Sequence, residues 1–124
     1  MKVVAIGCDK SGYPAVLRTL EGGCTPQLEV DVRGVSCLGV VRESLLLEIL
    51  EGDASYILLA GCPLDSCHNL EGSRFAKARA ERVNALLDEA EVDKRVVLAF
   101  VTADKTSPIR DALARCVDEK DRVT

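Results

Sequence analysis

The chain has 124 residues, of which 48% are apolar and 29% charged, and its formal net charge is −4. It is long enough to enclose one hydrophobic core but too short for two ordinary domains, so we expect a single domain over residues 1–124. The acidic balance argues against nucleic acid as the main partner, because phosphate binding needs a basic surface. With no signal-peptide pattern and no apolar run near the about 20 residues of a membrane span, we expect a cytoplasmic protein.

The first half of the chain predicts two strand-and-helix pairs. Lys2–Cys8 is a β-branched apolar run followed by a polar turn, which is typical of a buried strand. A short helix is expected over 13–20, before two glycines that end it. Residues 28–35 alternate apolar with polar or glycine, which predicts a strand at the edge of a sheet that ends near Cys37. A second helix follows over 42–51.

The second half repeats the alternation. Residues 54–60 are apolar without interruption, as in a strand buried on both faces, and 95–101 predict a further strand. The helix expected over 71–90 carries its apolar residues at helical spacing, namely Phe75, Ala78, Val83, Leu86, Leu87 and Ala90. The last helix, over 108–119, is expected to turn Ile109, Leu113 and Cys116 or Val117 inward.

Strands that alternate with helices predict an α/β fold with a parallel sheet covered on both faces. We expect a three-layer flavodoxin-like domain with four parallel strands in the order 2-1-3-4. Neither of the glycine-rich phosphate-binding patterns occurs after a strand, so nucleotide binding has little support.

Six cysteines need an explanation in a reducing compartment, where metal binding or redox chemistry is commoner than disulfide formation. Cys8, Cys37 and Cys62 each fall at the carboxyl end of a predicted strand, where open parallel sheets bind their ligands. In the order 2-1-3-4 these ends are neighbours, so the three sulfurs are expected to converge. Cys67 follows Cys62 after four residues, which is enough for a loop to aim both thiolates at one centre.

Four thiolates suit either a structural zinc ion or an iron–sulfur cluster. Structural zinc commonly uses C-x₂-C pairs, which are absent here, so the open C-x₄-C turn favours a two-iron cluster over zinc. Thiols without a metal are the second alternative. A nucleophilic Cys62 is a third, although the C-x₅-R loop of thiol phosphatases is missing, because His68 stands at the arginine position.

The remaining candidates have ordinary interpretations. Cys116 lies at apolar spacing on a predicted helix and is expected in the core. Cys24 is expected in a surface loop, and His68, the only histidine, at the start of a helix. Four basic residues follow the cysteine loop and are typical of a solvated helix face, namely Arg74, Lys77, Arg79 and Arg82.

These residues together resemble a known family. The run from Gly61-Cys62 through Asp65, Cys67-His68 and Glu71-Gly72 is similar to the signature of the delta subunit of methyl-viologen-reducing hydrogenase, with Ala76 and Arg79 at the family's helical spacing. Cys37-Leu38-Gly39 is similar to its second cysteine segment. The resemblance extends over essentially the whole chain.

The resemblance implies a 2Fe-2S cluster held by cysteines, for which the candidates here are Cys8, Cys37, Cys62 and Cys67. It implies an electron-transfer subunit without a substrate of its own. Its partners would be a hydrogenase or dehydrogenase module and the large subunit of a heterodisulfide-reductase-like complex, which carries FAD and iron–sulfur clusters.

The chain departs from the family after its first strand. Where the family carries a C-C-x-x-C cluster, this sequence reads Gly7-Cys8-Asp9-Lys10-Ser11, so that only Cys8 is left of three cysteines. A ligand at the third position would have to come from Ser11, Cys24 or His68. The alternative function is a structural adaptor that has lost its cluster and remains in a large redox complex.

Overall fold

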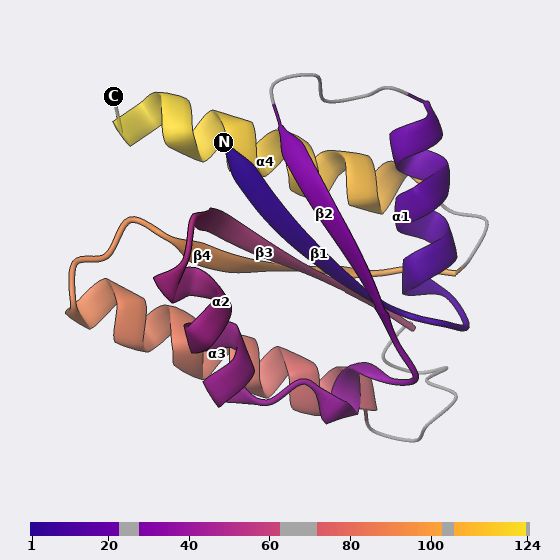
Figure 1. Cartoon of the computed structure of the whole chain (residues 1–124), viewed down its shortest axis with the longest axis horizontal. Coiled ribbons are helices and arrows are strands. Elements are labelled where there is room, and N and C mark those ends of the chain that lie inside the picture. Colours follow the sequence, from indigo (N-terminus) through magenta and orange to yellow (C-terminus); the bar gives the residue numbers. More distant parts are fainter. Residues whose placement is uncertain (23–27, 63–71, 103–105, 124) are drawn as a thin grey trace.

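Four strands and four α-helices alternate along the chain in the computed structural model, which describes residues 1–22, 28–62, 72–102 and 106–123, and side chains as far as Cys116 (Figure 1). In chain order the elements are β1 (Lys2–Cys8), α1 (Gly12–Glu21), β2 (Glu29–Val35), the 3₁₀-helix η1 (Leu38–Val40), α2 (Glu43–Glu51), β3 (Ala54–Gly61), α3 (Gly72–Glu89), β4 (Arg95–Phe100) and α4 (Ser107–Val123).

The strands form one parallel sheet in the order β2-β1-β3-β4, which confirms the predicted fold class and order. β1 pairs with both β2 and β3, so that Ile6 is opposite Leu59 on one side and Arg33 on the other. β4 extends the sheet beyond β3. The α/β architecture is that of a three-layer flavodoxin-like domain.

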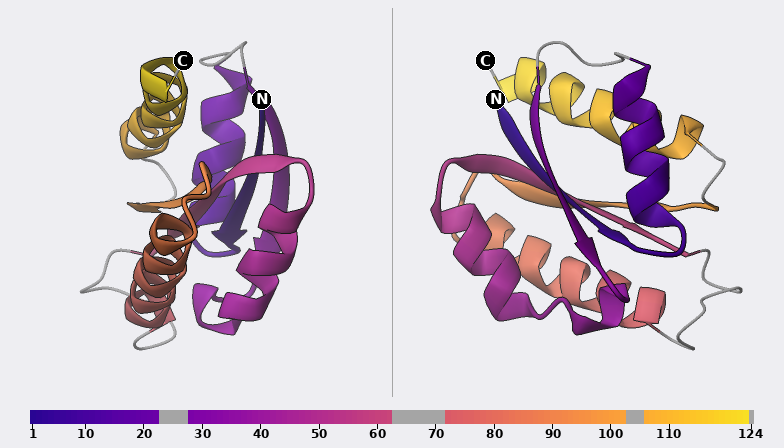
Figure 2. Two further views of the ribbon diagram at one scale, coloured as in Figure 1. Left: turned by 90° about the vertical axis from the view of Figure 1, so that its left-hand side faces the viewer. Right: turned by 45° about the vertical axis from the view of Figure 1, so that its right-hand side comes forward.

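The helices cover both faces of the sheet, as Figures 1 and 2 show: α1 and α4 lie on one face, and η1, α2 and α3 on the other. Alternating strand residues supply the two cores, because neighbouring side chains point to opposite faces. In β1, Val3 and Ala5 join the first core, whereas Val4 and Ile6 join the second. α4 contributes Ile109, Leu113 and Cys116 to the first core, as predicted.

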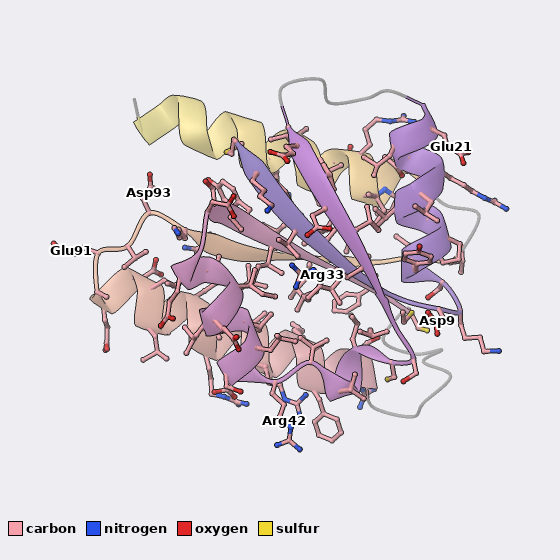
Figure 3. The ribbon with its side chains drawn as sticks, in the orientation of Figure 1. Asp9, Glu21, Arg33, Arg42, Glu91 and Asp93 are labelled. Carbon is pink, nitrogen blue, oxygen red and sulfur yellow. The ribbon has the colours of Figure 1, made fainter. Side chains whose placement is uncertain are left out.

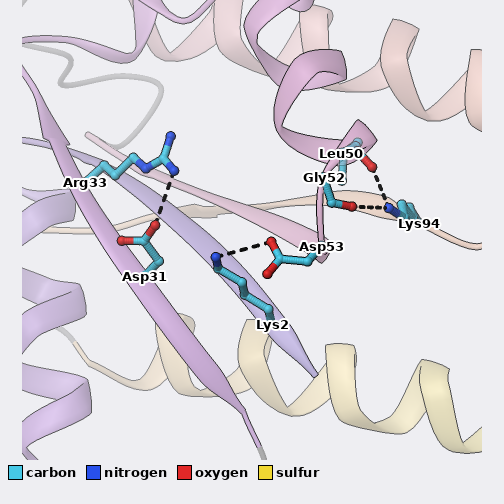
Figure 4. Close-up of polar contacts among 7 residues, drawn as sticks. All are labelled: Lys2, Asp31, Arg33, Leu50, Gly52, Asp53 and Lys94. Carbon is cyan, nitrogen blue, oxygen red and sulfur yellow. Dashed lines mark hydrogen bonds and ion pairs between the residues drawn. The ribbon is translucent and has the colours of Figure 1, made fainter.

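The two strand types expected from the sequence are both present. β2 lies at a sheet edge and is largely accessible, whereas β3 is buried along nearly its whole length. At the amino end of the sheet, the Lys2 ammonium contacts the Asp53 carboxylate at 3.3 Å, and Lys94 donates to the carbonyl oxygens of Leu50 and Gly52 at the end of α2 (Figure 4). These contacts lie at the opposite end of the strands from Cys8 and Cys62.

The inner stripe of α3 differs from the prediction. Phe75 and Leu86 are each 51% exposed, while Ala76, Ala80, Val83 and Leu87 face the sheet. Val83 and Leu87 were predicted on the inner side, but Ala76 and Ala80 take the places expected for Phe75 and Leu86, because small residues let a helix lie close to its sheet. Among the helices described here, none is both long and apolar enough to cross a membrane.

Candidate functional site

The candidate site lies where the chain connections from β1 and β3 diverge. The two strands are hydrogen-bonded neighbours, but α1 follows β1 onto one face of the sheet and α3 follows β3 onto the other. Open α/β sheets bind ligands outside the carboxyl ends of strands at such a point. Asp9, labelled in Figure 3, lies in the turn between β1 and α1 and marks this end of the sheet.

Three buried side chains meet at this point. Cys8 Sγ lies 3.7 Å from Cys62 Sγ, and the Ser11 hydroxyl lies 3.1 Å from the first sulfur and 3.2 Å from the second. The three residues are between 3% and 5% exposed. The structure therefore brings together two of the four predicted ligands, with a serine between them; we call this group the sulfur–hydroxyl triangle.

The spacing of the two sulfurs fits a metal centre. Two thiolates on one tetrahedral metal, each bonded at about 2.3 Å, stand about 3.8 Å apart. Cys8 and Cys62 are already at this separation and are not joined by a disulfide bond. Because thiolates are soft ligands, the pair suits zinc or iron–sulfur chemistry rather than magnesium or calcium.

Gly12 allows the triangle to form. A β-carbon at Gly12 would lie 1.8 Å from the carbonyl oxygen of Ala60, so the start of α1 can touch β3 only without a side chain at this position. This approach brings Ser11, the residue before α1, next to Cys62 after β3. From the sequence, Gly12 is interpreted as a simple turn residue, because its role depends on a strand residue 48 positions further along the chain.

The environment of Cys8 favours its thiolate form. Burial raises the pKa of this thiol, but hydrogen bonds from the Gly12 backbone, the Ser11 side chain and backbone, and Cys62 together outweigh burial and hold the pKa below its ordinary value. The Gly12 amide lies 3.4 Å from the sulfur, at the amino terminus of α1. Thiolate is the form that binds metals.

The backbone of Cys62 is fixed from the second face of the sheet. Ser73, in the first turn of α3, is 2% exposed and donates its hydroxyl to the Cys62 carbonyl oxygen at 2.8 Å. This contact ties the end of β3 to the start of α3. Cys67 and His68 lie between these two elements, outside the described residues, as does Cys24.

Cys37 lies two residues beyond β2, near the strand end that the sequence predicts. β2 ends at Val35, and Cys37 precedes η1, with its half-buried sulfur accepting the Gly39 amide hydrogen at 3.3 Å. Leu38 packs beside Gly61, so η1 lies at the same end of the sheet as the triangle. Within the described part of the chain, however, no three His, Cys, Asp or Glu side chains gather as a metal site would require. The third donor beside Cys8 and Cys62 is Ser11.

Arg79 holds η1 in place, a role that the sequence does not reveal. Its guanidinium donates to the carbonyl oxygens of Gly39 and Val41, at 2.7 and 3.0 Å, and lies 5.8 Å from the centre of the Phe75 ring. The interpretation of Arg79 as part of a solvated face is therefore wrong. Its helical spacing gave no sign of this role, because the partner carbonyls belong to a segment about 40 residues away.

We expect Arg79→Ala to lower the free energy of unfolding by about 2 kcal/mol, because hydrogen bonds from a charged donor to two carbonyls are lost. Arg82→Ala is the matched control on the same helix. It removes only an accessible ion pair with Glu43 and should cost less than about 1 kcal/mol. Urea unfolding followed by circular dichroism measures both variants. Equal losses would show that the contacts of Arg79 do not stabilise η1.

Comparison with known proteins identifies the family. Residues 3–122 match the family of the delta subunit of methyl-viologen-reducing hydrogenase. A subunit of a ferredoxin:CoB-CoM heterodisulfide reductase from Methanosarcina mazei is 25% identical over 122 residues, as is the corresponding subunit of a ferredoxin/F420H2-dependent CoB-CoM heterodisulfide reductase from Methanosarcina acetivorans. The match covers 98% of this chain but 15% of each relative, so the chain spans a small part of their length.

A relative of more similar size is the iron–sulfur subunit of an F420-non-reducing hydrogenase from Archaeoglobus profundus. It is 30% identical over 106 residues, which are 83% of this chain and 76% of the relative. With the family match extending over nearly every residue, this chain belongs to the family of methyl-viologen-reducing hydrogenase delta subunits.

Proposed function

We propose that the chain is an electron-transfer subunit whose centre is a 2Fe-2S cluster at the carboxyl ends of β1 and β3. The observation that carries this proposal is the 3.7 Å separation of the buried Cys8 and Cys62 sulfurs, which suits two thiolates of one metal centre. Cys37 and Cys67 are the further ligands that the sequence predicts. The bound cluster would accept and release single electrons.

The chain's own residues prepare the site for this role. Burial of Cys8 and Cys62 keeps water from the sulfurs, and the Gly12 amide donates a hydrogen bond to Cys8. Hydrogen bonds to sulfur and exclusion of solvent are two of the factors that set the potential of a cluster. The contact between Ser73 and the Cys62 backbone holds the second thiolate in position.

Relatives support a place in a larger redox complex. One relative is an iron–sulfur subunit of a hydrogenase, and in two others the corresponding segment is part of a heterodisulfide reductase subunit. We therefore propose that the chain relays electrons between a hydrogenase or dehydrogenase module and a heterodisulfide-reductase-like subunit with FAD and iron–sulfur clusters. The chain would supply the electron path and no substrate site of its own.

The test is an assay of iron, acid-labile sulfide and visible absorbance on protein purified without oxygen. We expect about two iron and two sulfide per chain, with the colour of a two-iron cluster. Colourless protein without iron, both as isolated and after incubation with ferrous iron and sulfide, would contradict the proposal. That result would favour the cluster-less structural adaptor.

A further inference from the structure

The Ser11 side chain does not have the role that its position in the chain suggests. Serine is a preferred residue immediately before a helix, because its hydroxyl accepts a backbone N–H of the first turn. Ser11 stands at this position of α1, yet within residues 1–22, all of which are described, its side chain makes no such capping bond. The hydroxyl is instead directed toward the two sulfurs at 3.1 and 3.2 Å.

The hydroxyl is placed as a third ligand would be. On a tetrahedral metal with sulfur at about 2.3 Å and oxygen at about 2.0 Å, an oxygen ligand stands about 3.5 Å from each sulfur. Ser11 Oγ lies a few tenths of an ångström closer than this to both sulfurs, while the sulfurs themselves are already at the separation of two ligands. A small outward shift of one side chain would therefore make room for a metal ion that is bound by the two sulfurs and the oxygen.

We propose that Ser11 is a metal ligand of this chain, so that Cys8, Cys62 and the Ser11 oxygen bind one metal ion through two sulfurs and one oxygen. A single metal ion can take all three donors. The inference rests on the proposed function for its extension to cluster iron, which is also bound by sulfide, so that only two of the three donors would then bind the same iron. On binding, the two thiols and the hydroxyl each release a proton as the metal–ligand bonds form.

An oxygen ligand is expected to change the reduction potential of the metal centre. Oxygen is a harder donor than sulfur and stabilises the more highly charged ferric state. A cluster with Ser11 as a ligand is therefore expected to have a lower reduction potential than the same cluster in Ser11→Cys. The chain would supply a stronger reductant than an all-cysteine centre in the same fold.

Cobalt(II) is the probe for the first experiment, because its absorbance distinguishes sulfur from oxygen ligands and needs no cluster assembly. We expect Ser11→Ala to weaken cobalt binding by more than about 100-fold, which exceeds the usual effect of losing an outer hydrogen bond. Added imidazole should bind at the vacated position and change the spectrum of this variant further than that of the wild type, in which only the fourth coordination position is open. Ser11→Cys should bind cobalt with one additional thiolate charge-transfer contribution.

Ser55→Ala is the matched control, because Ser55 is a half-buried serine of β3 at the opposite end of the strand. It should bind cobalt as the wild type does, and circular dichroism should show all variants folded. The ligand assignment is overturned if Ser11→Ala binds cobalt as the control does. A weakening of about 10- to 100-fold, with an imidazole effect no larger than that of the wild type, would make Ser11 an outer hydrogen-bond donor and also overturns it.

The same variants reconstituted with iron and sulfide separate this inference from the proposed function. If wild-type protein assembles no cluster but the cobalt results are as expected, the electron-transfer proposal fails and the Ser11 ligand stands. If Ser11→Ala keeps the wild-type cluster content, electron paramagnetic resonance spectrum and potential, the electron-transfer proposal stands and the Ser11 ligand fails. We expect loss of cluster in Ser11→Ala and a raised potential in Ser11→Cys.

Discussion

Cys62→Ala is expected to abolish the visible chromophore and nearly all bound iron. The variant removes one of two thiolates that lie 3.7 Å apart in a buried position, and an alanine methyl group cannot bind metal. Outer-shell substitutions already cost about 10- to 100-fold in metal affinity, so removal of a ligand should cost more. Iron and sulfide assays on protein purified without oxygen measure the effect.

Cys116→Ala is the matched control for a buried cysteine. Cys116 is fully buried in the core between the sheet, α1 and α4, and its substitution should leave the chromophore intact. We expect Cys67→Ala to behave as Cys62→Ala, although Cys67 lies outside the described residues. Full cluster content in Cys62→Ala would show that the ligand assignment is wrong, whatever the behaviour of the other two variants.

Gly12→Ala is expected to destabilise the fold by about 2 kcal/mol or more and to disrupt the sulfur–hydroxyl triangle. Alanine gains about 0.5–1 kcal/mol over glycine in a helix. Against this gain, its β-carbon would lie 1.8 Å from the Ala60 carbonyl oxygen, and overpacking of this kind costs about 1–3 kcal/mol or more. Both clashing groups are fixed to the backbone, so α1 must move away from β3. The cost of the clash therefore exceeds the helix-propensity gain, and the variant is expected to be less stable than the wild type.

Gly22→Ala provides the control at the other end of α1. Gly22 has a helical φ of −74°, and an added β-carbon would lie 3.3 Å from the Thr19 carbonyl oxygen and 4.0 Å from that of Arg18. We expect a stability change within about 1 kcal/mol and unchanged iron content. Urea unfolding and iron assays on both variants test the prediction. If Gly12→Ala is as stable as Gly22→Ala and keeps its metal, the close approach of α1 to β3 does not position the site.

Most of the fold was predictable because local patterns of apolar and polar residues indicate the strands and helices. The apolar runs of β1 and β3 differ from the alternating pattern of β2, and this difference indicated the exposed edge, while the flavodoxin-like architecture supplied the expected order of the strands. The order then placed Cys8 beside Cys62, since the carboxyl ends of adjacent parallel strands meet. The structure confirms this proximity at 3.7 Å.

The parts that sequence reasoning missed all depend on contacts between distant segments. The family resemblance singles out the position of Ser11, but nothing in the local pattern shows that its hydroxyl contacts the two sulfurs, or distinguishes Arg79 from a solvated arginine. Their partners are Cys62, which is 51 positions away from Ser11, and the η1 carbonyls, about 40 positions from Arg79. The 3₁₀ turn η1 was likewise not expected from the sequence, and it places Leu38 beside Gly61.

The inner face of α3 shows a different limit of prediction from the sequence. Its apolar residues occur at helical spacing on more than one side: Phe75 and Leu86 lie on the accessible side, whereas Val83 and Leu87 lie on the buried side. Helix periodicity locates a helix but selects the buried stripe poorly when small residues such as Ala76 and Ala80 line the contact. The distance between α3 and the sheet, which the sequence does not reveal, determines which side of the helix is buried.

A redox titration followed by electron paramagnetic resonance tests the central claim most directly, because it asks whether the chain carries a reversible one-electron centre. Oxygen-free protein should be silent when oxidised, should develop the signal of a reduced two-iron cluster on reduction, and should lose it on reoxidation. Cys62→Ala should give no such signal. Wild-type protein that shows no signal at any potential, after reconstitution with iron and sulfide, would contradict the account.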